Sequence, residues 1–473
     1  MFESLIKKNI NIKLFKVISQ IADESNLECF IIGGYVRDLV MGKYEPKDVD
    51  ILVVGDGIEL AKKVCKKLTP LTKVKIYKNF RTAAFKYKNI DLEFVGSRKE
   101  SYISSSRNPE VEIGTLQDDI NRRDFTINSI GICLNSKNWG KILDNFNGLN
   151  DISKKLIITP LDPIKTFSDD PLRMLRAIRF SCQLGFLIDP KCLKTISLEK
   201  NRIKIISGER ISEELNKILM TKTPSTGFKI LYQTGILEII LPELTSLKGI
   251  EEIEGQKHKD NFYHTLEVLD NICNTTNNLW LRWSALLHDI GKAPTKKFIK
   301  KIGWTFHGHE FEGSKMVYHL FKRIKLPLND KMKYVQKLVF MSSRPIVLAQ
   351  DIVTDSAVRR LVFDAGEYVD DLMTLCEADI TTKNEKKFDK YHNNFKLVRN
   401  KIIEVEERDS IRNFQPPISG EEIMTKFSLK PSKVIGTLKE IIKEAILEGD
   451  IPNEYNAAYD LMIREAKKLG LKE

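Results

Sequence analysis

The chain has 473 residues, of which 42% are hydrophobic and 30% are charged, and its formal net charge is +12. This length and composition predict a globular protein of several domains, and no apolar run is long enough to span a bilayer. The positive charge favours a polyanionic partner but does not identify it. Seven scattered cysteines without a C-x-x-C pair argue against a disulfide framework or a zinc ribbon and fit a reducing compartment. Because the N-terminus lacks the apolar stretch of a signal peptide, we expect a cytoplasmic protein.

The sequence pattern changes along the chain. Up to about residue 150, short β-rich runs such as DILVVG (50–55) alternate with helical stretches, which predicts an α/β or α+β domain. From Asp169 onward, apolar residues recur at spacings of three and four, which predicts helices. Segments rich in Pro, Gly or Asn mark the expected breaks, at 159–170, 221–227, 413–420 and 449–455.

A glycine pair follows the apolar run CFII (29–32). Gly33 and Gly34 are expected to end a strand in a tight turn, and YVRDLVMG (35–42) to form a short helix that ends at Gly42. Backbone amides at a turn into a helix N-terminus suit phosphate. For the glycines alone, an ordinary turn is an equally good interpretation.

Two aspartates stand one residue apart in the expected strand DVDILVV (48–54). Because side chains alternate along a strand, Asp48 and Asp50 point to the same face. Neighbouring carboxylates repel each other, so the pair suits a cation such as Mg²⁺, which binds carboxylates together with substrate phosphates. A further strand, NIDLEFVG (89–96), offers Asp91 and Glu93 as a third carboxylate. The alternative is that the aspartates merely face solvent.

These motifs resemble the nucleotidyltransferase superfamily that includes DNA polymerase β, and within it the class II tRNA nucleotidyltransferase and bacterial poly(A) polymerase family. The resemblance continues through NRRDFTINSIGICLN (121–135), DDPLRMLRAIRFSCQLGF (169–186) and ERISEELNKIL (209–219). It implies an α+β fold: a polymerase-β-like head with a five-stranded sheet, followed by an all-α neck and body and a helical tail. It also implies template-independent addition of CCA, or part of it, to the 3′ end of tRNA from CTP and ATP.

By this resemblance, the catalytic and magnesium-binding carboxylates are Asp48, Asp50 and Glu93, the last because it stands five residues before Arg98. The residues that the resemblance implies for nucleotide binding are Gly33, Gly34, Arg37, Arg122, Arg123, Asp124, Asn128, Asp169, Asp170, Arg173, Arg176 and Arg179. Two Mg²⁺ ions would activate the tRNA 3′-hydroxyl and stabilise the departing pyrophosphate, a reaction that needs positioning and charge neutralisation more than covalent help.

Base selection is expected from the segment that begins at Asp169. Asp169, Asp170 and Arg173 match the family's E-D-x-x-R motif, with Asp in place of Glu. A carboxylate and a guanidinium one helical turn apart place an acceptor beside a donor fork. Cytosine and adenine each offer an amino donor beside a ring-nitrogen acceptor, so one Asp–Arg pair can accept both and reject guanine and uracil. The alternative is an i,i+3 salt bridge, worth only about 0.2–0.5 kcal/mol.

A second group of motifs begins at His264. FYHTLEVL (262–269), ALLHDIGK (285–292) and FHGHE (306–310) are together similar to an HD metal-dependent phosphohydrolase domain. The ligands that this similarity implies are His264, His288, Asp289, His309 and Asp379, for one or two divalent ions, with Ni, Mn, Zn or Fe as candidates. A helix-capping His–Asp pair is the alternative. The internal HD domain and the tail resemble one bacterial subgroup of the CCA-adding family. Where members of that subgroup usually read His-Leu-Arg-Pro, this chain has SSRP (342–345), which puts an activity that needs that histidine in doubt.

The expected domains are a catalytic head (1–150), a helical neck that binds RNA and nucleotide (151–250), an HD domain (251–385) and a helical tail (386–473). Two other functions compete with CCA addition. One is poly(A) polymerase or a specialised CC- or A-adding enzyme. The residues that distinguish these activities are expected chiefly in the loop 101–119. The other is an HD phosphohydrolase whose N-terminal half only binds RNA. The expected partners are the tRNA 3′ end, CTP and ATP, with no membrane, and the oligomeric state is left open.

Overall fold

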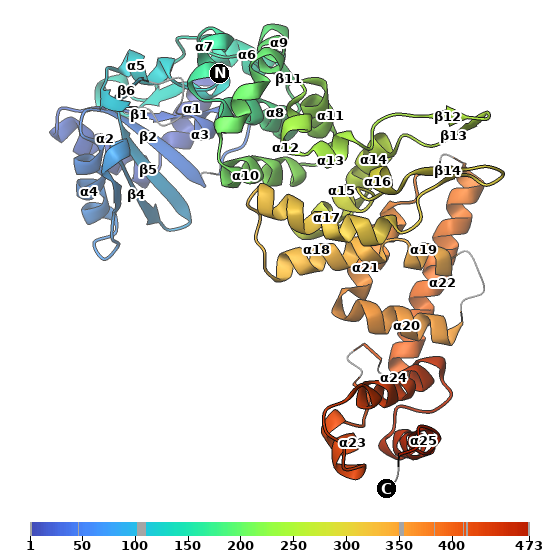
Figure 1. Cartoon of the computed structure of the whole chain (residues 1–473). Coiled ribbons are helices and arrows are strands. Elements are labelled where there is room, and N and C mark those ends of the chain that lie inside the picture. The colour runs from blue at the N-terminus through green and yellow to red at the C-terminus, as the bar shows by residue number, and fades with distance from the viewer. Residues whose placement is uncertain are drawn as a thin grey trace. The chain divides into compact units, whose positions relative to one another are not determined.

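The computed structural model describes residues 2–45, 47–101, 110–349, 354–382, 384–409, 411–412 and 415–471. The chain divides into two compact units (Figure 1). Unit 1 comprises residues 1–221 and 226–240, and unit 2 comprises residues 222–225 and 241–473. In the loop expected to separate the nucleotide-adding activities, residues 102–109 lie outside the described part of the chain. None of the described helices combines the length and the hydropathy needed to cross a membrane.

Unit 1 is built on one mixed sheet with the strand order β3-β4-β5-β2-β1-β8-β9. Its strands are β1 (Glu28–Ile32), β2 (Asp48–Val54), β3 (Lys75–Tyr77), β4 (Thr82–Tyr87), β5 (Ile90–Gly96), β8 (Gly131–Cys133) and β9 (Ile142–Leu143). β2 and β5 are parallel, whereas the other neighbours are antiparallel. The chain leaves β2 through helix α4 (Gly57–Leu68) before it returns as β5, and a parallel pair requires a long connection of this kind.

The prediction of five strands was too low, since the described residues form seven strands in this sheet. The two additional strands are its edges. β3 has three residues, all of them exposed, and β9 has only two residues. Strands this short carry no alternation of apolar and polar residues that a sequence could reveal. A separate pair of strands, β6 (Arg98–Ser101) and β7 (Glu110–Ile113), precedes helix α5 (Leu116–Asn121).

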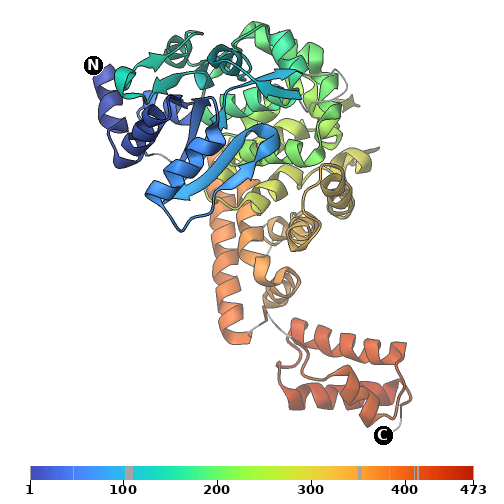
Figure 2. The ribbon, with the colours of Figure 1, turned by 90° about the vertical axis from the view of Figure 1, so that its left-hand side faces the viewer.

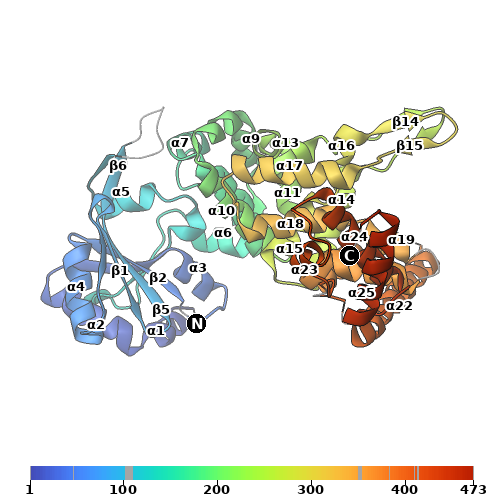
Figure 3. The same ribbon diagram turned by 60° about the horizontal axis from the view of Figure 1, so that its bottom comes forward.

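The two faces of β2 have different neighbours. Helices α2 (Lys13–Glu24) and α4 pack against each other and against the sheet (Figure 3). Val49, Ile51 and Val53 are buried almost completely, so the alternate face carries Asp48 and Asp50.

Helix α5 is fixed over the aspartate face by an apolar cluster. Ile120 of α5 packs with Ile32 of β1 and Leu52 of β2, and all three side chains are buried. Leu52 lies two residues beyond Asp50 and therefore on the same face. This packing places the residues that follow α5 beside the aspartates.

The remainder of unit 1 is mainly helical. Its other helices are α1 (Phe2–Ile10), α3 (Gly34–Val40), α6 (Gly148–Lys154), α7 (Pro163–Asp169), α8 (Leu172–Leu184), α9 (Pro190–Glu199), α10 (Gly208–Leu219), α11 (Ser225–Gln233) and α12 (Ile236–Ile240). The expectation of an all-α neck was not met in full, because β10 (Leu156–Ile157) and β11 (Leu187–Ile188) form a parallel pair. Each has only two residues, which is again too short for a detectable pattern.

In the described part of unit 2, helices dominate and the strands form two hairpins. Its helices up to the tail are α13 (Pro242–Thr245), α14 (Asn261–Cys273), α15 (Leu279–Leu287), α16 (Lys292–Thr295), α17 (His309–Arg323), α18 (Asp330–Met341), α19 (Arg344–Leu348), α20 (Asp355–Ala365) and α21 (Val369–Ala378). Phe262, Trp283 and Phe321 are among its largest fully buried side chains. The hairpins are β12 (Glu252–Ile253) with β13 (Gln256–Lys257), and β14 (Lys297–Ile299) with β15 (Gly303–Thr305).

The tail begins with the long helix α22 (Glu385–Asp409), which Figure 2 shows in orange. Helices α23 (Gly420–Lys426), α24 (Lys433–Glu448) and α25 (Tyr455–Lys468) follow it, in red. Arg360 of α20 donates hydrogen bonds to Glu444 and Glu448 of α24, which fixes this helix to the preceding part of unit 2.

Candidate active site and metal centre

The expected carboxylates of unit 1 lie on two adjacent strands. In the parallel pair, Asp50 of β2 stands directly opposite Glu93 of β5, and Asp48 stands opposite Asp91. Asp48 is exposed and Asp50 is half-buried, whereas Glu93 is accessible to solvent but partly desolvated by its neighbours. The register therefore places four carboxylates on one face of the sheet.

The carboxylates of Asp48, Asp50 and Glu93 repel one another. Burial raises the pKa of Asp50, an effect that Arg123 opposes and the neighbouring Asp48 reinforces. Burial and Asp50 likewise raise the pKa of Glu93, against the effect of Arg98. A divalent cation would relieve this repulsion, and the donor set fits Mg²⁺, which accepts one or two carboxylates together with phosphate oxygens.

The glycine turn lies against these carboxylates. Gly33 has φ +85°, a backbone conformation that residues other than glycine rarely adopt, and it is the N-cap residue immediately before helix α3. A Cβ atom on Gly33 would lie 3.4 Å from Oδ2 of Asp50 and 3.4 Å from Nη1 of Arg123. The absence of a side chain thus keeps open the space between a carboxylate and a guanidinium, which suits a triphosphate with its metal ion.

The two arginines after α5 are positioned by a carboxylate that sequence reasoning missed. Asp119 is fully buried, and its two oxygens accept hydrogen bonds from Arg122 and Arg123, at 2.9 Å and 3.2 Å. Arg122 also donates to Glu100 at 3.2 Å. The signal was present in the acidic pair of LQDDINRRD (116–124), but the sequence alone does not show which aspartate points inward.

A chain of hydrogen bonds joins the glycine turn to helix α8. Arg37, which is buried, donates to Asn128 at 2.9 Å, and Asn128 donates to Asp124 at 3.1 Å. Asp124 in turn accepts from Arg176 of α8 at 2.8 Å. Burial opposes ionisation, but Arg176 and Asn128 lower the pKa of Asp124 to about 2. Four of the expected nucleotide-binding residues thus form one connected network.

Three guanidinium groups surround the ring of Phe180 on α8. Those of Arg37, Arg176 and Arg179 lie 5.1 Å, 5.4 Å and 3.9 Å from its centroid. Arg179 is further held by Glu214 of α10, which accepts from it at 2.6 Å. This pair is buried, so Arg179 is held within the fold by Glu214 and by the ring of Phe180.

The expected base-selecting residues do not form the simple salt bridge that was the alternative. Asp169 ends α7, whereas Asp170 lies between α7 and α8 and accepts a hydrogen bond from the amide of Leu172 at 3.1 Å. Arg173, which is buried, donates to the carbonyl oxygens of Thr166 at 3.3 Å and Arg122 at 2.7 Å. Among the described residues no ion pair joins Asp170 to Arg173.

A cavity of about 630 Å³ opens at the aspartate face. Its lining includes Asp48 and Asp50 of β2, Gly34 and Arg37 of α3, and Gln183 of α8. This volume lies within the range of sites that bind small molecules, and its walls combine carboxylates with a guanidinium. The cavity therefore suits a charged ligand that carries its own metal ion.

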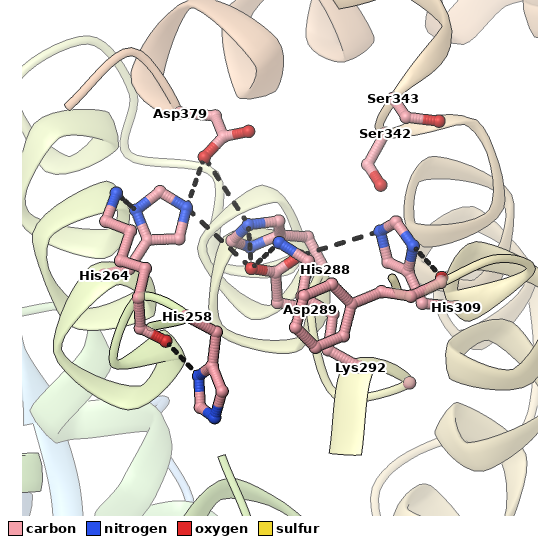
Figure 4. A network of polar contacts seen from close by, with 12 residues as sticks. His258, His264, His288, Asp289, Lys292, His309, Ser342, Ser343 and Asp379 are labelled. Carbon is pink, nitrogen blue, oxygen red and sulfur yellow. Dashed lines mark hydrogen bonds and ion pairs between the residues drawn. The ribbon is translucent and has the colours of Figure 1, made fainter. Parts of the chain in front are cut away.

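The HD motifs of unit 2 converge on a second site (Figure 4). Nε2 of His264 lies 2.7 Å from Oδ1 of Asp379, and Nε2 of His288 lies 3.7 Å from the same oxygen. These three ligand atoms lie within 4.8 Å of one another, the only such triple in the described part of the chain. Oδ2 of Asp289 lies 3.4 Å from His288 Nε2. A cavity of about 180 Å³ adjoins Asp379.

Two buried atoms of this cluster form no hydrogen bond of good geometry, namely Nε2 of His288 and Oδ1 of Asp379, although the latter lies 2.7 Å from Nε2 of His264. Nδ1 of His288 lies 2.7 Å from the carbonyl oxygen of Ala285, which fixes the ring and leaves Nε2 as the free acceptor. Buried polar groups without partners are costly, so the arrangement fits a divalent ion that would bind both atoms. Burial opposes ionisation of Asp289, but His288, Lys292 and His264 hold its pKa below the ordinary value.

The remaining residues of the HD motifs have different surroundings. His309 lies at the edge of the cluster, with Nε2 3.8 Å from Oδ1 of Asp289, whereas His307 is exposed. Two lysines contact the cluster and were missed in the sequence. Lys292 donates to Asp289 at 2.7 Å, and Lys259 lies 2.7 Å from Nδ1 of His264. Lys292 is recognisable as the last residue of HDIGK, three positions after Asp289, but Lys259 carries no such signal.

Three family models match the chain in the order of these sites. They are the poly A polymerase head domain over residues 29–158, the probable RNA- and SrmB-binding site of polymerase A over 185–248, and the HD domain over 261–384. A multifunctional CCA protein of Neisseria gonorrhoeae is 30% identical over 309 residues, which cover 64% of this chain and 70% of that protein. The chain belongs to the class II tRNA nucleotidyltransferase and poly(A) polymerase family.

Other members of the tRNA nucleotidyltransferase family support this assignment. An A-adding tRNA nucleotidyltransferase of Deinococcus radiodurans is 28% identical over 354 residues, or 72% of this chain and 78% of that protein. The fold also matches a solved Thermotoga maritima CCA-adding enzyme complexed with tRNA, with a TM-score of 0.62, 21% identity and 98% of each chain covered. The head and HD domains of this family both indicate a dependence on divalent metal ions.

Proposed function

We propose that this chain adds CCA to the 3′ end of tRNA from CTP and ATP, without a nucleic-acid template. The observation that carries the proposal is the placement of Asp50 opposite Glu93, beside Asp48, on the open face next to Gly33 and Arg123. A module that only bound RNA would gain nothing from carboxylates clustered on one face of the sheet, where they repel one another. The similarity to multifunctional CCA and A-adding proteins supports the same reaction class.

Within this proposal, Asp48, Asp50 and Glu93 hold Mg²⁺, which supplies charge neutralisation and activates the tRNA 3′-hydroxyl when bound. The turn at Gly33 and Gly34 and the guanidinium groups of Arg37 and Arg123 contact the triphosphate. Arg122, Asp124 and Asn128 orient the triphosphate and ribose through their hydrogen bonds. The base is recognised at the start of α8, where Asp170 and Arg173 are the template, Asp169 precedes them, and Arg176 and Arg179 fix the helix.

The experiment uses tRNA transcripts that end at the discriminator base, at C or at CC, each incubated with CTP alone, ATP alone or both. CCA addition predicts two added nucleotides with CTP on the shortest transcript, one with ATP on the transcript ending in CC, and three with both. Extension of the CC transcript alone would identify an A-adding enzyme. Long tails with ATP on every RNA would identify a poly(A) polymerase.

A second activity is proposed for unit 2, where His264, His288, Asp289 and Asp379 would bind a transition metal such as Ni, Mn, Zn or Fe. The buried Nε2 of His288, which has no hydrogen-bond partner, and the convergence of His264, His288 and Asp379 favour it. Such a centre supplies a metal-bound hydroxide for hydrolysis of small phosphoesters, such as 2′,3′-cyclic ends. Hydrolysis of a 2′,3′-cyclic nucleotide by the full chain should require added Ni²⁺ or Mn²⁺. It should be lost in His288→Ala and retained in Asp50→Ala, whereas equal rates in both variants would reject the assignment.

We propose the domain boundaries that the sequence predicts: head 1–150, neck 151–250, HD domain 251–385 and tail 386–473. We further propose that the protein acts in the cytoplasm, where its seven cysteines, which form no disulfide in the described part of the chain, would stay reduced. Thiol titration of the protein from unfractionated cells, with and without reductant, tests this compartment.

A further inference from the structure

The ring of Phe180 joins three parts of unit 1. Phe180 lies on α8 and is 5% exposed. The guanidinium carbon of Arg37, from α3, lies 5.1 Å from the centroid of its ring. Phe125, from the segment that follows α5, meets the ring edge to face at 5.8 Å. The ring therefore contacts the helix of the glycine turn and the segment that carries Arg122 and Arg123, besides lying on its own helix.

The three guanidinium groups around this ring are already neutralised. Each has its own carboxylate, and the pairs lie 2.8 Å, 2.6 Å and 2.6 Å apart in Arg37–Asp38, Arg176–Asp124 and Arg179–Glu214. The ring is therefore not needed to balance their charge. What it adds is an aromatic face of negative electrostatic potential, which attracts a planar cation at short range. An aliphatic side chain of similar size would fill the space without this attraction.

The ring provides a direct contact between Arg37 and α8. The hydrogen bonds that Arg37 donates to Asp38, at 2.9 Å and 2.8 Å, stay within α3. Its hydrogen bond to Asn128, at 2.9 Å, leads to the segment after α5. Neither of these reaches α8 itself, whereas the ring of Phe180 does. The position of Arg37 relative to α8 thus depends on the ring as well as on the longer chain of hydrogen bonds through Asp124.

The two sides of this contact serve different parts of the proposed nucleotide site. Arg37 lines the cavity at Asp48 and Asp50, on the side proposed for the triphosphate. Helix α8 begins at Leu172, beside the residues proposed to select the base. Phe180 stands about two helical turns further on, and a helix transmits a shift over that length as a rigid element. A change in the contact between Arg37 and the ring is therefore felt at the start of α8.

We propose that Phe180 is a positioning residue of the nucleotide site, whose ring holds Arg37 against α8 so that triphosphate binding and base selection support each other. The proposal rests on the nucleotide addition proposed above. Phe180 contacts no substrate and acts through the three guanidinium groups around its ring.

The direct test keeps the shape of the ring and changes its electrostatic potential. Phenylalanines with one, two and three fluorine atoms on the ring are introduced at position 180 of the full chain, because each fluorine weakens the attraction for a cation. ATP addition to a tRNA ending in CC is measured at steady state. We expect the KM for ATP to rise with each fluorine, to about tenfold with three, while the KM for tRNA stays within about twofold. A lower melting temperature with an unchanged KM for ATP would make the ring purely structural and overturn the inference.

Leucine variants supply a matched comparison. Phe180→Leu should raise the KM for ATP by at least about tenfold and lower the preference for ATP over GTP by a similar factor. Phe167→Leu replaces a fully buried ring of α7 that has no cation over it in the described part of the chain, and it should lower the melting temperature without either effect.

Equal changes in the two leucine variants would overturn the inference, because the loss of any buried ring would then act on the site. The fluorinated series decides if Phe180→Leu does not fold. A wild-type chain that added no nucleotide to this tRNA would instead contradict the proposed function.

Discussion

Asp50 on β2 lies directly opposite Glu93 on the parallel strand β5, so that two strands far apart in sequence place their carboxylates on a common face. The neighbouring step of the same register pairs Asp48 with Asp91. The register alone thus offers two candidates for the third acidic ligand. They differ in surroundings, since Asp91 lies 3.8 Å from the ammonium group of Lys86 at the exposed end of the pair.

Glu93→Gln should lower the rate of nucleotide addition by at least about tenfold, which corresponds to about 1.4 kcal/mol of activation free energy. Because burial and Asp50 raise the pKa of Glu93, removing its charge should leave the melting temperature equal or higher. Asp91→Asn is the matched control and should keep its rate within about twofold of wild type. Single-turnover assays with saturating tRNA and Mg²⁺ measure both. The reverse ranking of the two variants would assign the third ligand to Asp91.

Gly33→Ala should impair both stability and activity. The φ of +85° would strain an alanine by about 1–3 kcal/mol, and its Cβ would lie against Asp50 and Arg123. Gly185→Ala is the control for strain alone, since it has φ +69° and no atom within 4 Å of the added Cβ. Thermal unfolding should show a lower melting temperature for both variants, but only Gly33→Ala should raise the KM for CTP and ATP. An unchanged KM in Gly33→Ala would show that the turn at Gly33 does not contribute to nucleotide binding.

Replacement of Asp170 should change base choice. Asp170→Asn can still accept the hydrogen bond from Leu172, so its stability should match wild type, whereas Asp170→Ala should lose about 1 kcal/mol with that hydrogen bond. Both should weaken C and A incorporation by roughly ten- to a hundredfold, on the scale of about 1–3 kcal/mol for a lost partner. Both variants should also show a smaller preference for CTP and ATP over UTP and GTP. Equal losses for all four nucleotides would show that Asp170 only stabilises the start of α8 and does not select the base.

Asp124 should make the stability of unit 1 sensitive to acid. Its pKa falls to about 2 from an ordinary value of 3.8, so the ionised form contributes stability above about pH 4, and this is lost as the pH falls towards 2. The contribution is on the order of 2 kcal/mol. Asp124→Asn should therefore be less stable than wild type at pH 7, with a deficit that shrinks below pH 4.

The control for this pH dependence is Asp151→Asn. Burial raises the pKa of Asp151, so its protonated form contributes stability at low pH, and the deficit of this variant should grow on acidification instead. Urea unfolding between pH 3 and pH 7 measures both differences. A deficit of Asp124→Asn that stays constant across this range would contradict the assigned pKa.

The sequence was sufficient for those parts of the site that depend on local periodicity. Alternation along DVDILVV predicted that Asp48 and Asp50 share a face, and β2 begins at Asp48 as expected. The partners that hold the arginines could not be predicted, because they depend on packing between distant segments. Glu214 lies 35 residues after Arg179, and the inward orientation of Asp119 follows from the packing of Ile120 against the sheet. The edge strands β3 and β9 were missed because two or three residues carry no period.

The measurement that tests the central claim most directly is the single-turnover rate of ATP addition to a tRNA ending in CC, for Asp48→Ala and Asp50→Ala against wild type. Each change removes a proposed Mg²⁺ ligand and a like-charged neighbour, so the fold and tRNA binding should persist while the rate falls below detection. Far-ultraviolet circular dichroism and a tRNA binding isotherm serve as controls. If either variant kept more than about a tenth of the wild-type rate, a loss of only about 1.4 kcal/mol, the two aspartates would not be the catalytic metal ligands.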